Sequence, residues 1–337
     1  MLEHAPTEAA LTDSYGRPVG DLRLSVTDRC NLRCAYCIPE EAPQFQPRDE
    51  LLTFEEMERL VGLFCQLGVA KVRLTGGEPL LRRELHHLVA ALDRLDGVRD
   101  LALTTNGIFL TAQLDVLVAA GLQRVNISLD TLRRERFWLL TRRGGLSKVL
   151  DAINAARDAA LSPLKVNVVP MRGFNDDEIV DFGALARELG VVVRFIEFMP
   201  LEAGDVWSKD LMVPGREVYA ALEREWGGLE LVDPSHPSET AERFRFRDGV
   251  GEIGIISPVT RPFCGACNRA RLTADGKLRT CLFSLAEVDL KVPMRSNATD
   301  EQLLDLIIAA WHGKKEGHLI NSLDFVRPAR TMSAIGG

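Results

Sequence analysis

Residues 21–37 read DLRLSVTDRCNLRCAYC. The first part, residues 22–27, is a short run of the kind that forms a β-strand. The second part is a loop in which Cys30, Cys34 and Cys37 follow the spacing C-x3-C-x2-C. Cysteine sulfur binds zinc and iron–sulfur clusters alike, and three thiolates on one loop can hold either. The stretch therefore predicts a metal centre directly after the first strand.

Five more strand-like runs follow, separated by amphipathic segments. We expect these strands at residues 71–75, 101–105, 124–129, 164–171 and 191–199. Signals for the start of a helix stand at Thr53 with Glu56, at Thr111, and at Asn175 with Glu178. Repeated strand–helix units predict a parallel sheet with helices outside it.

The predicted fold is therefore α/β, a partial (β/α)6 barrel of the TIM type. Six units are too few for a closed barrel of eight strands, and a doubly wound open sheet is the alternative that periodicity does not separate. In both folds ligands bind at the carboxyl ends of the strands. Chemically unusual residues gather at those ends, at positions 28–30, 76–78, 104–106, 128–130 and 199–200.

The strand–helix pattern stops after Leu201. Residues 232–240, VDPSHPSET, are typical of a loop or linker. We expect a barrel domain with the first cysteine group over residues 1–225. Residues 226–337 should form a C-terminal region that closes the open side of the barrel.

A second cysteine group lies in this C-terminal region. Cys264, Cys267 and Cys281 have the spacing C-x2-C-x13-C, and Arg269 and Arg271 follow two and four residues after Cys267. Arginine presents a planar fork of donors that suits phosphate and purine acceptors. An arginine pair of this kind is otherwise an ordinary solvated face, and its position beside three cysteines favours a ligand.

Composition excludes several classes of protein. The formal net charge of −7 argues against broad binding to nucleic acid. No apolar run approaches a membrane span, and residues 1–20 lack the pattern of a signal peptide, so a cytoplasmic location without membrane attachment is expected.

Seven cysteines without a secretory signal do not indicate a disulfide framework, and Cys65, which fits no motif, is expected in the core. The histidines lie beside neither cysteine group in sequence, which weakens zinc as the metal: His4, His86, His87, His236, His312 and His318.

These motifs resemble the radical S-adenosylmethionine superfamily and, more narrowly, the GTP 3′,8-cyclases of molybdenum-cofactor biosynthesis. The resemblance rests on DLRLSVTDRCNLRCAYC, on the GGEP of residues 76–79, and on FCGACNRARL at residues 263–272. It implies a 4Fe-4S cluster on the first cysteine group, whose open iron binds S-adenosylmethionine for reductive cleavage to a 5′-deoxyadenosyl radical. It implies a second 4Fe-4S cluster, close to GTP, on the second group.

The resemblance also implies ligand contacts, position by position. For S-adenosylmethionine these are Tyr36, Gly77, Ser128 and Met199. For GTP they are Arg23, Arg73, Thr104, Lys165, Arg269, Ala270 and Arg271. The chain end, Gly336 and Gly337, is expected to thread into the active site. Without the resemblance, Arg23 and Lys165 are equally well explained by salt bridges at strand ends, and Met199 by the core.

The implied reaction converts GTP to (8S)-3′,8-cyclo-7,8-dihydroguanosine 5′-triphosphate, which makes the protein a lyase. The implied partners are a reductant such as a flavodoxin or ferredoxin, a downstream cyclic pyranopterin monophosphate synthase, and a second copy of the chain in a homodimer. Two alternatives stay open at this point. One is a peptide-modifying radical enzyme with an auxiliary cluster, and the other is a zinc-binding scaffold without catalytic activity.

Overall fold

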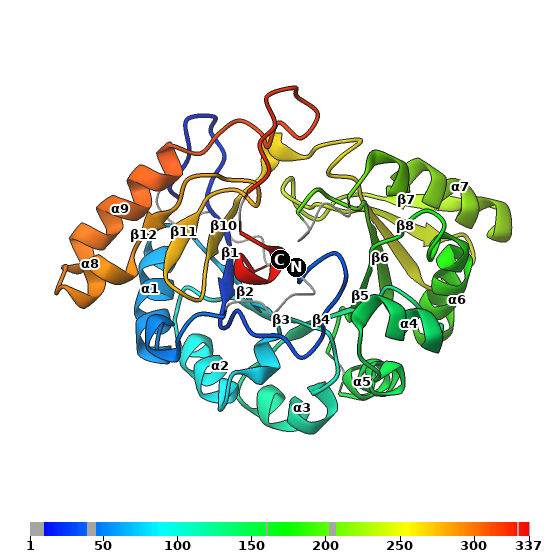
Figure 1. Cartoon of the computed structure of the whole chain (residues 1–337), viewed down its shortest axis with the longest axis horizontal. Coiled ribbons are helices and arrows are strands. Elements are labelled where there is room, and N and C mark those ends of the chain that lie inside the picture. Colours follow the sequence, from blue (N-terminus) through cyan, green and yellow to red (C-terminus); the bar gives the residue numbers. More distant parts are fainter. Residues whose placement is uncertain (1–9, 39–44, 160, 202–206, 329, 337) are drawn as a thin grey trace.

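The computed structural model describes residues 10–38, 45–159, 161–201, 207–328 and 330–336. Its centre is a curved parallel sheet with helices around the outside (Figure 1). The first six strands are β1 (Asp21–Ser25), β2 (Lys71–Thr75), β3 (Asp100–Thr105), β4 (Arg124–Ser128), β5 (Lys165–Val168) and β6 (Val192–Ile196). They pair in chain order, each parallel to the next, as the sequence predicts.

The C-terminal region lengthens this sheet at both edges. Its strands are β7 (Leu229–Val232), β8 (Glu242–Phe246), β9 (Glu252–Ile256), β10 (Arg269–Leu272), β11 (Lys277–Arg279) and β12 (Val288–Asp289). Strand β9 pairs parallel to β6, and β10 pairs parallel to β1. The described strands form one open sheet in the order β12-β11-β10-β1-β2-β3-β4-β5-β6-β9-β8-β7. The α/β partial barrel is thus confirmed, and its parallel part includes two strands beyond the predicted six.

The helices are α1 (Phe54–Gln66), α2 (Leu85–Asp93), α3 (Leu110–Ala119), α4 (Arg134–Thr141), α5 (Leu146–Asp158), α6 (Ile179–Leu189), α7 (Gly215–Trp226), α8 (Lys291–Arg295) and α9 (Asp300–His312). Alternation along the strands explains how they pack. In β1, Leu22 and Leu24 are fully buried in the main core beneath the helices, whereas Arg23 between them lines the interior of the barrel. A side-chain period of two puts an apolar set outside and a polar set inside on the same strand.

Of residues 232–240, predicted to be a loop or a linker, residues 233–240 are a loop and Val232 is the last residue of β7. This loop connects β7 to β8, which form an antiparallel hairpin at one edge of the sheet. Neither these two strands nor helix α7 was predicted. Strand β8 has the sequence ERFRF, in which three of five residues are charged, so its apolar signal is weak.

One of the predicted helix starts is confirmed. Thr53 and Glu56 form a reciprocal capping box at α1, with Glu56 N–H donating to Thr53 Oγ1 at 3.2 Å. The prediction for Thr111 is wrong, because α3 already begins at Leu110 and Phe109 precedes it without a side-chain cap. An apolar residue, the buried Leu110, therefore starts this helix.

The predicted cap at Asn175 and Glu178 is also wrong. The Asn175 amide donates to the carbonyls of Asp130 (2.6 Å) and Val169 (3.0 Å), and Glu178 accepts from the Thr131 hydroxyl at 2.7 Å. Both side chains are buried, where a polar group must be hydrogen-bonded. They join the loops after β4 and β5 and do not cap the helix.

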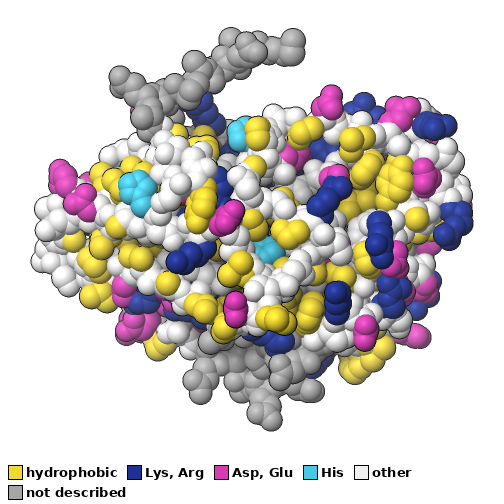
Figure 2. All heavy atoms as spheres, turned by 90° about the horizontal axis from the view of Figure 1, so that it is seen from above, with side chains coloured by type: hydrophobic (Ala, Val, Ile, Leu, Met, Phe, Trp, Pro, Cys, Tyr) yellow, Lys and Arg dark blue, Asp and Glu magenta, His cyan; other side chains and the backbone are white. Residues whose placement is uncertain are grey.

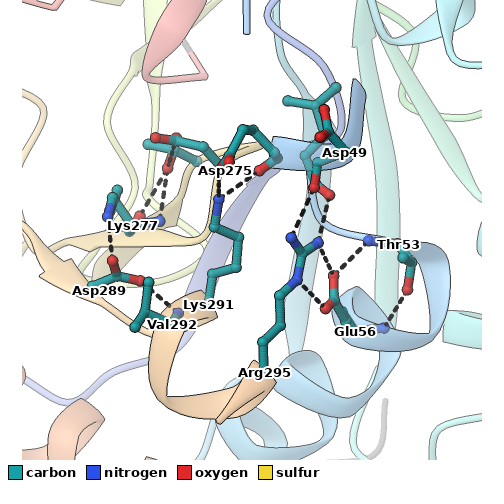
Figure 3. Close-up of polar contacts among 12 residues, drawn as sticks. Asp49, Thr53, Glu56, Asp275, Lys277, Asp289, Lys291, Val292 and Arg295 are labelled. Atoms are coloured by element: carbon teal, nitrogen blue, oxygen red, sulfur yellow. Dashed lines mark hydrogen bonds and ion pairs between the residues drawn. The ribbon is translucent and has the colours of Figure 1, made fainter. Parts of the chain in front are cut away.

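Helix α8 is fastened to the start of α1 and to the residues just before it (Figure 3). The Arg295 guanidinium donates to both carboxylate oxygens of Glu56, at 2.7 and 3.0 Å, and to the carbonyl of Asp49 at 2.8 Å. Lys291 forms an ion pair with Glu50, and Lys277 one with Asp289. Partly exposed pairs contribute at most about 1 kcal/mol each, so these contacts orient α8 more than they stabilise it.

Charged side chains of both signs are interspersed on the face that Figure 2 shows. None of the described helices is both long enough and apolar enough to span a membrane. The C-terminal segment, drawn in red in Figure 1, does not stay on this surface and reaches the centre of the barrel.

Candidate active site

A cavity of about 320 Å³ lies inside the barrel, and both cysteine groups line it. The first group follows the carboxyl end of β1. Cys264 and Cys267 precede β10, which is parallel to β1, so the second group lies at the opposite, amino end of the strands. Cys281 returns to the same end, because it follows β11 and β11 is antiparallel to β10. The structure therefore brings the two triads to the two ends of one chamber.

The first triad is held by a loop that rests on the end of α4. The Ala35 N–H donates to the Leu140 carbonyl, and the Arg33 N–H to the Thr141 carbonyl, both at 2.9 Å. The Cys30 sulfur accepts from the Leu32 N–H at 3.4 Å. Two backbone hydrogen bonds to a helix end thus fix the loop that carries all three thiols.

Burial governs the acidity of this triad. It raises the pKa of Cys30 to about 11 and that of Cys37 to about 12, and it raises the pKa of Cys34 well above the ordinary range. The charges of Cys37, Asp130 and Cys30 add to the shift in the pKa of Cys34, because like charges nearby disfavour a further anion. In the metal-free protein these thiols are protonated at neutral pH, so a bound metal must displace the protons.

The Gly76–Gly77 pair packs directly against the stem of the cysteine loop. An added Cβ would stand 2.3 Å from the Thr27 carbonyl oxygen at Gly76 and 2.3 Å from the Arg29 carbonyl oxygen at Gly77. The Gly77 N–H donates to the Thr27 carbonyl at 2.8 Å. Only glycine allows two backbones to approach so closely.

The neighbouring Glu78 is a buried structural carboxyl. It accepts from the Thr105 hydroxyl and the Asn106 N–H, both at 2.7 Å, and from the Leu80 N–H at 3.0 Å. Burial raises its pKa to about 7 despite these donors. Its carboxylate oxygens are therefore engaged in joining the loops after β2 and β3.

All four predicted S-adenosylmethionine positions line the carboxyl end of the cavity: Tyr36, Gly77, Ser128 and Met199. The Tyr36 hydroxyl donates to Asp130 Oδ2 at 2.6 Å, and its ring meets Phe198 edge-on at 6.0 Å. Burial raises the pKa of Asp130 to about 6. Asp130 was not predicted as a site residue, although it belongs to the unusual cluster at positions 128–130.

Arginines form a row across three neighbouring strands. Arg271 on β10 is in register with Arg23 on β1, which is in register with Arg73 on β2, and all three line the cavity. The Nε atoms of Arg23 and Arg73 are buried and have no hydrogen-bond partner in the described chain. Burial, together with the neighbouring cations, holds the pKa of Arg23 well below its usual range and lowers that of Arg271 to about 10. Asp21 lies close enough to act on these arginines, but no ion pair within the described chain joins them to an anion. Buried cations that lack a paired anion are unfavourable, so this row is suited to an anionic ligand.

Arg194 on β6 is a further cation that was not predicted. It donates to the Asn167 side-chain oxygen at 2.9 Å and to that of Asn126 at 3.2 Å, and it lines the cavity together with Thr104. Burial, then the charges of Arg73 and Arg124, lowers its pKa to about 9. Its alternating position in the strand VVRFI is the signal that would have revealed it.

Two predicted GTP positions do not line the cavity. Lys165 is half-buried at the amino end of β5, where burial and the charge of Arg194 lower its pKa to about 8. The Ala270 side chain is fully buried in the main core, on the opposite face of β10 from Arg269 and Arg271. This placement follows from strand alternation and leaves only the backbone of Ala270 near the chamber.

Cations surround the second triad. Arg269 Nη2 lies 3.3 Å from the Cys267 sulfur, and Lys314 Nζ lies 3.5 Å from it. Lys314 also donates to the carbonyls of Cys267 (2.9 Å) and Arg269 (3.1 Å). Burial acts to raise the pKa of Cys267, but the two cations outweigh it and bring that pKa to about 7.

An N-terminal ion pair supports the same triad. Arg17 is buried and pairs with Asp13 at 2.6 Å. Its Nη1 atom donates to the carbonyls of Cys264 (2.9 Å) and Glu316 (2.7 Å), and its Nη2 atom to that of Lys315 (2.7 Å). Arg17 thus joins three segments that are far apart in sequence, which is why it was not predicted.

His318, which is far from both cysteine groups in sequence, lies beside the second group in the structure. Its backbone N–H donates to Cys264, and its ring packs against Phe283 with centroids 5.0 Å apart. His318 also lines the cavity. Distance along the chain was a poor guide here, because the segment after α9 folds back over the second triad.

The C-terminal tail enters the barrel between the triads. The Ser333 N–H donates to Cys37, and Ile335 is fully buried. The Gly336 carbonyl accepts from Arg271 Nη1 at 2.7 Å, and a Cβ there would stand 2.6 Å from the Thr75 hydroxyl. Gly337, also predicted to take part, lies outside the described residues.

Comparison with known proteins defines the class first. Residues 24–186 match the radical SAM superfamily, and residues 191–320 match the family Molybdenum Cofactor Synthesis C. Among solved structures, Streptococcus suis SuiB bound to S-adenosylmethionine superposes with a TM-score of 0.58 at 13% identity, over 88% of this chain and 67% of that chain. Fold, cysteine loop and superfamily match together make this chain a radical S-adenosylmethionine enzyme, which works with a 4Fe-4S cluster.

The relatives narrow the class. The GTP 3′,8-cyclase of Rhodopirellula baltica is 46% identical over 97% of this chain and 92% of that protein. The GTP 3′,8-cyclase of Streptomyces coelicolor is 47% identical over 97% of this chain and 96% of that protein. The chain belongs to the GTP 3′,8-cyclase family. The main prediction from the sequence is confirmed over the peptide-modifying alternative.

Proposed function

We propose that this enzyme converts GTP to (8S)-3′,8-cyclo-7,8-dihydroguanosine 5′-triphosphate, an early step of molybdenum-cofactor biosynthesis. The observation that carries the proposal is the arginine row between the two cysteine triads. Arg23, Arg73 and Arg271 lie side by side in a buried cavity, and two of their Nε atoms lack a partner within the described chain. A triphosphate supplies several anionic oxygens to such a row, and it pairs cations that are otherwise costly to bury.

Both triads fit a 4Fe-4S cluster held by three cysteines. All six thiols are free of disulfides and line the same cavity, three at each end. The first cluster is assigned to Cys30, Cys34 and Cys37, and the second to Cys264, Cys267 and Cys281. When bound, the first cluster and S-adenosylmethionine supply the one-electron chemistry that removes a hydrogen atom from the substrate.

The carboxyl end of the cavity is assigned to S-adenosylmethionine, with Tyr36, Gly77, Ser128 and Met199 as its contacts. The Tyr36–Asp130 pair adds a carboxyl to this end, and a carboxylate favours a cationic sulfonium or ammonium group nearby. Gly77 keeps the loop after β2 tight against the cysteine loop, so it shapes the pocket through the backbone.

The middle and amino end are assigned to GTP. Its contacts are Arg23, Arg73, Thr104, Lys165, Arg269, Ala270 and Arg271. Arg269 lies between the arginine row and the second triad, where it can reach a phosphate or the purine. Ala270 would contribute its backbone, since its side chain faces the core.

The tail is assigned a part in the reaction rather than in folding. Gly336 sits against Arg271 and Thr75, where a larger residue would not fit. Removing Gly336 and Gly337 should leave iron content and GTP affinity intact while product formation falls below detection. Unchanged turnover of the truncated protein would assign the tail to packing alone.

The remaining assignments follow the family. We propose that a flavodoxin or ferredoxin supplies the electrons, that a cyclic pyranopterin monophosphate synthase takes up the product, and that the enzyme is a cytoplasmic homodimer. We also propose a functional division into residues 1–225, with the first cluster, and residues 226–337, with the second cluster and the Gly-Gly tail. Gel filtration of the iron-loaded protein tests the dimer.

One experiment tests the function. The anaerobically purified protein is incubated with GTP, S-adenosylmethionine and dithionite, and the nucleotide product is identified by mass after oxygen-free separation. The expected result is the cyclised triphosphate together with 5′-deoxyadenosine, and no cyclised product from ATP. Formation of 5′-deoxyadenosine without any change in GTP would reject the substrate. Zinc in place of iron and acid-labile sulfide would reject the enzyme class.

A further inference from the structure

We propose that the exposed face of helix α4 (Arg134–Thr141) is the docking surface on which an acidic one-electron carrier protein reduces the first cluster. The inference rests on the proposed function in one respect, namely that the cluster on Cys30, Cys34 and Cys37 receives electrons. Figure 1 shows α4 on the outside of the barrel beside α5 and α6. Three independent observations support it: exposed apolar side chains, local charge, and contact with the cysteine loop.

The first observation is an exposed apolar pair. Trp138 and Leu139 are adjacent on α4 and are 59% and 58% exposed, while Phe137 and Leu140 on either side of them are buried. The helix therefore has apolar residues on two sides, only one of which the fold covers. Exposing most of a tryptophan side chain to water is unfavourable, and tryptophan is enriched at the centres of protein interfaces.

The second observation is the charge around this pair. Residues 133–148 include six cations and a single anion, in a chain whose net charge is −7. Arg133 and Arg136 are used internally, in ion pairs with Asp177. Arg134, Arg143 and Lys148 are exposed, and no ion pair holds them within the described part of the chain. Cations around an apolar centre attract a partner with the opposite charge and orient it as it approaches.

The third observation connects this surface to the first triad. The Leu140 carbonyl, next to the exposed Leu139, accepts the Ala35 N–H at 2.9 Å, and Ala35 follows Cys34 directly. The Thr141 carbonyl holds the Arg33 N–H on the other side of Cys34 at the same distance. A path of peptide bonds and one hydrogen bond therefore leads from the exposed pair to a cluster thiol. A carrier seated on Trp138 would be close to the buried cluster without entering the cavity.

The electron balance is simple. In each encounter the carrier is oxidised by one electron and the cluster is reduced by one electron. No bond is formed or broken at the surface, and no proton needs to cross it. The partner is identified by its chemistry as a small protein with an exposed redox group in an acidic surface, which is the class to which flavodoxins and ferredoxins belong.

The test compares two reductants. The variants are Trp138→Ser with Leu139→Ser, and Arg134→Glu with Arg143→Glu. The matched control is Leu231→Ser with Arg245→Glu, on the outer hairpin β7–β8, where both residues are also exposed. Reduction of the first cluster is followed by its absorbance, with reduced flavodoxin in one arm and dithionite in the other. None of these residues contacts the cavity, so dithionite should reduce every variant at the rate of the parent protein.

With flavodoxin, the apolar variant should need about ten-fold more carrier for half-maximal rate, as expected for the loss of an interface hot spot. In the parent protein, lowering the salt concentration should increase the rate of reduction by flavodoxin, because opposite charges attract more strongly. The charge-reversed variant should not show this increase, and the control should match the parent. Equal flavodoxin rates in all proteins would overturn the proposal, and so would an equal loss with dithionite, which would indicate a damaged cluster loop. The readout is reduction of the cluster, so it separates this proposal from the proposed function. If flavodoxin reduces the cluster as expected but GTP stays unchanged, the proposed substrate is wrong and the docking surface stands.

Discussion

The two ends of the cavity differ in how they are built and in their charge. At the carboxyl end, one loop of eight residues supplies all three thiols, and burial raises their pKa values. At the amino end, the thiols come from two segments, and Arg17, Arg269 and Lys314 surround them. Only there is the pKa of a thiol, Cys267, lowered, to about 7.

This difference matches the two ligands assigned to the chamber. S-adenosylmethionine carries a sulfonium, which suits an end with the Tyr36–Asp130 pair and without an arginine row. GTP carries a triphosphate, which suits the arginines in the middle and at the amino end. The two sites also differ in sequence: the thiols of the first lie within one loop, whereas those of the second come together through the pairing of β10 with β11. The predictions below test the differences between the two sites, beginning with the largest effect.

Changing Cys34 to Ala should abolish cleavage of S-adenosylmethionine, because a cluster loses one of three ligands in a loop that offers no substitute. Changing Cys267 to Ala should abolish the cyclised product but leave some cleavage uncoupled from it, since the first site is intact. Both activities are measured by mass, as 5′-deoxyadenosine and as cyclised nucleotide. Normal product from Cys267→Ala would remove the functional difference between the two ends.

Changing Arg17 to Met should empty the second site and spare the first. Breaking a buried ion pair costs about 3–5 kcal/mol, and here it also releases the carbonyl of Cys264 and the segment after α9. Iron content should fall from that of two clusters to that of one, with cleavage of S-adenosylmethionine retained. Arg59→Met, which breaks an exposed pair with Asp300, is the control and should keep all its iron. Loss of both clusters from Arg17→Met would mean that the sites do not assemble independently.

The same contrast explains what could be predicted from the sequence. Strands β1 to β6 are short runs rich in apolar residues, and the three thiols of the first triad lie within one loop, so both are visible in short windows of the sequence. The pairing of β10 with β1 joins Arg271 to Arg23 across more than half of the chain, and no local pattern encodes it. The support of Cys264 by Arg17 is of the same kind.

Residue type was also ambiguous where polar groups are buried. Asn175 and Glu178 have the pattern of a helix cap, yet both satisfy loop groups inside the protein. Thr111 has the right chemistry for a cap one position after the helix has begun. For Asn175 and Glu178 the tertiary environment, which competes for the same hydrogen bonds, decided the outcome.

Changing Arg23 to Ala should weaken GTP binding and leave S-adenosylmethionine binding unchanged. Removing a charge-assisted contact from a buried pocket costs about 1.5–3 kcal/mol, which is roughly ten- to a hundred-fold in affinity. Arg269→Ala and Arg271→Ala should behave in the same way, although Arg271 also holds the Gly336 carbonyl. Affinities are measured by anaerobic calorimetry on iron-loaded protein. An equal loss for both ligands would indicate a disturbed barrel instead of a cationic binding site.

The smallest expected effect concerns Lys165. This residue is at the amino end of β5 but does not line the cavity, so its contact with GTP is expected to be the weakest. Burial lowers its pKa to about 8, so the free protein carries the ammonium below that pH and loses it above. A bound triphosphate favours the charged form and raises this pKa, so GTP binding takes up a proton at higher pH. The affinity for GTP should therefore fall roughly five- to ten-fold between pH 7 and pH 9, with most of the change above pH 8. In Lys165→Arg the affinity for GTP should stay high across this pH range, because a guanidinium remains charged throughout. In Lys165→Met the affinity should be low and independent of pH. A profile that is the same in all three proteins would place Lys165 outside the GTP site.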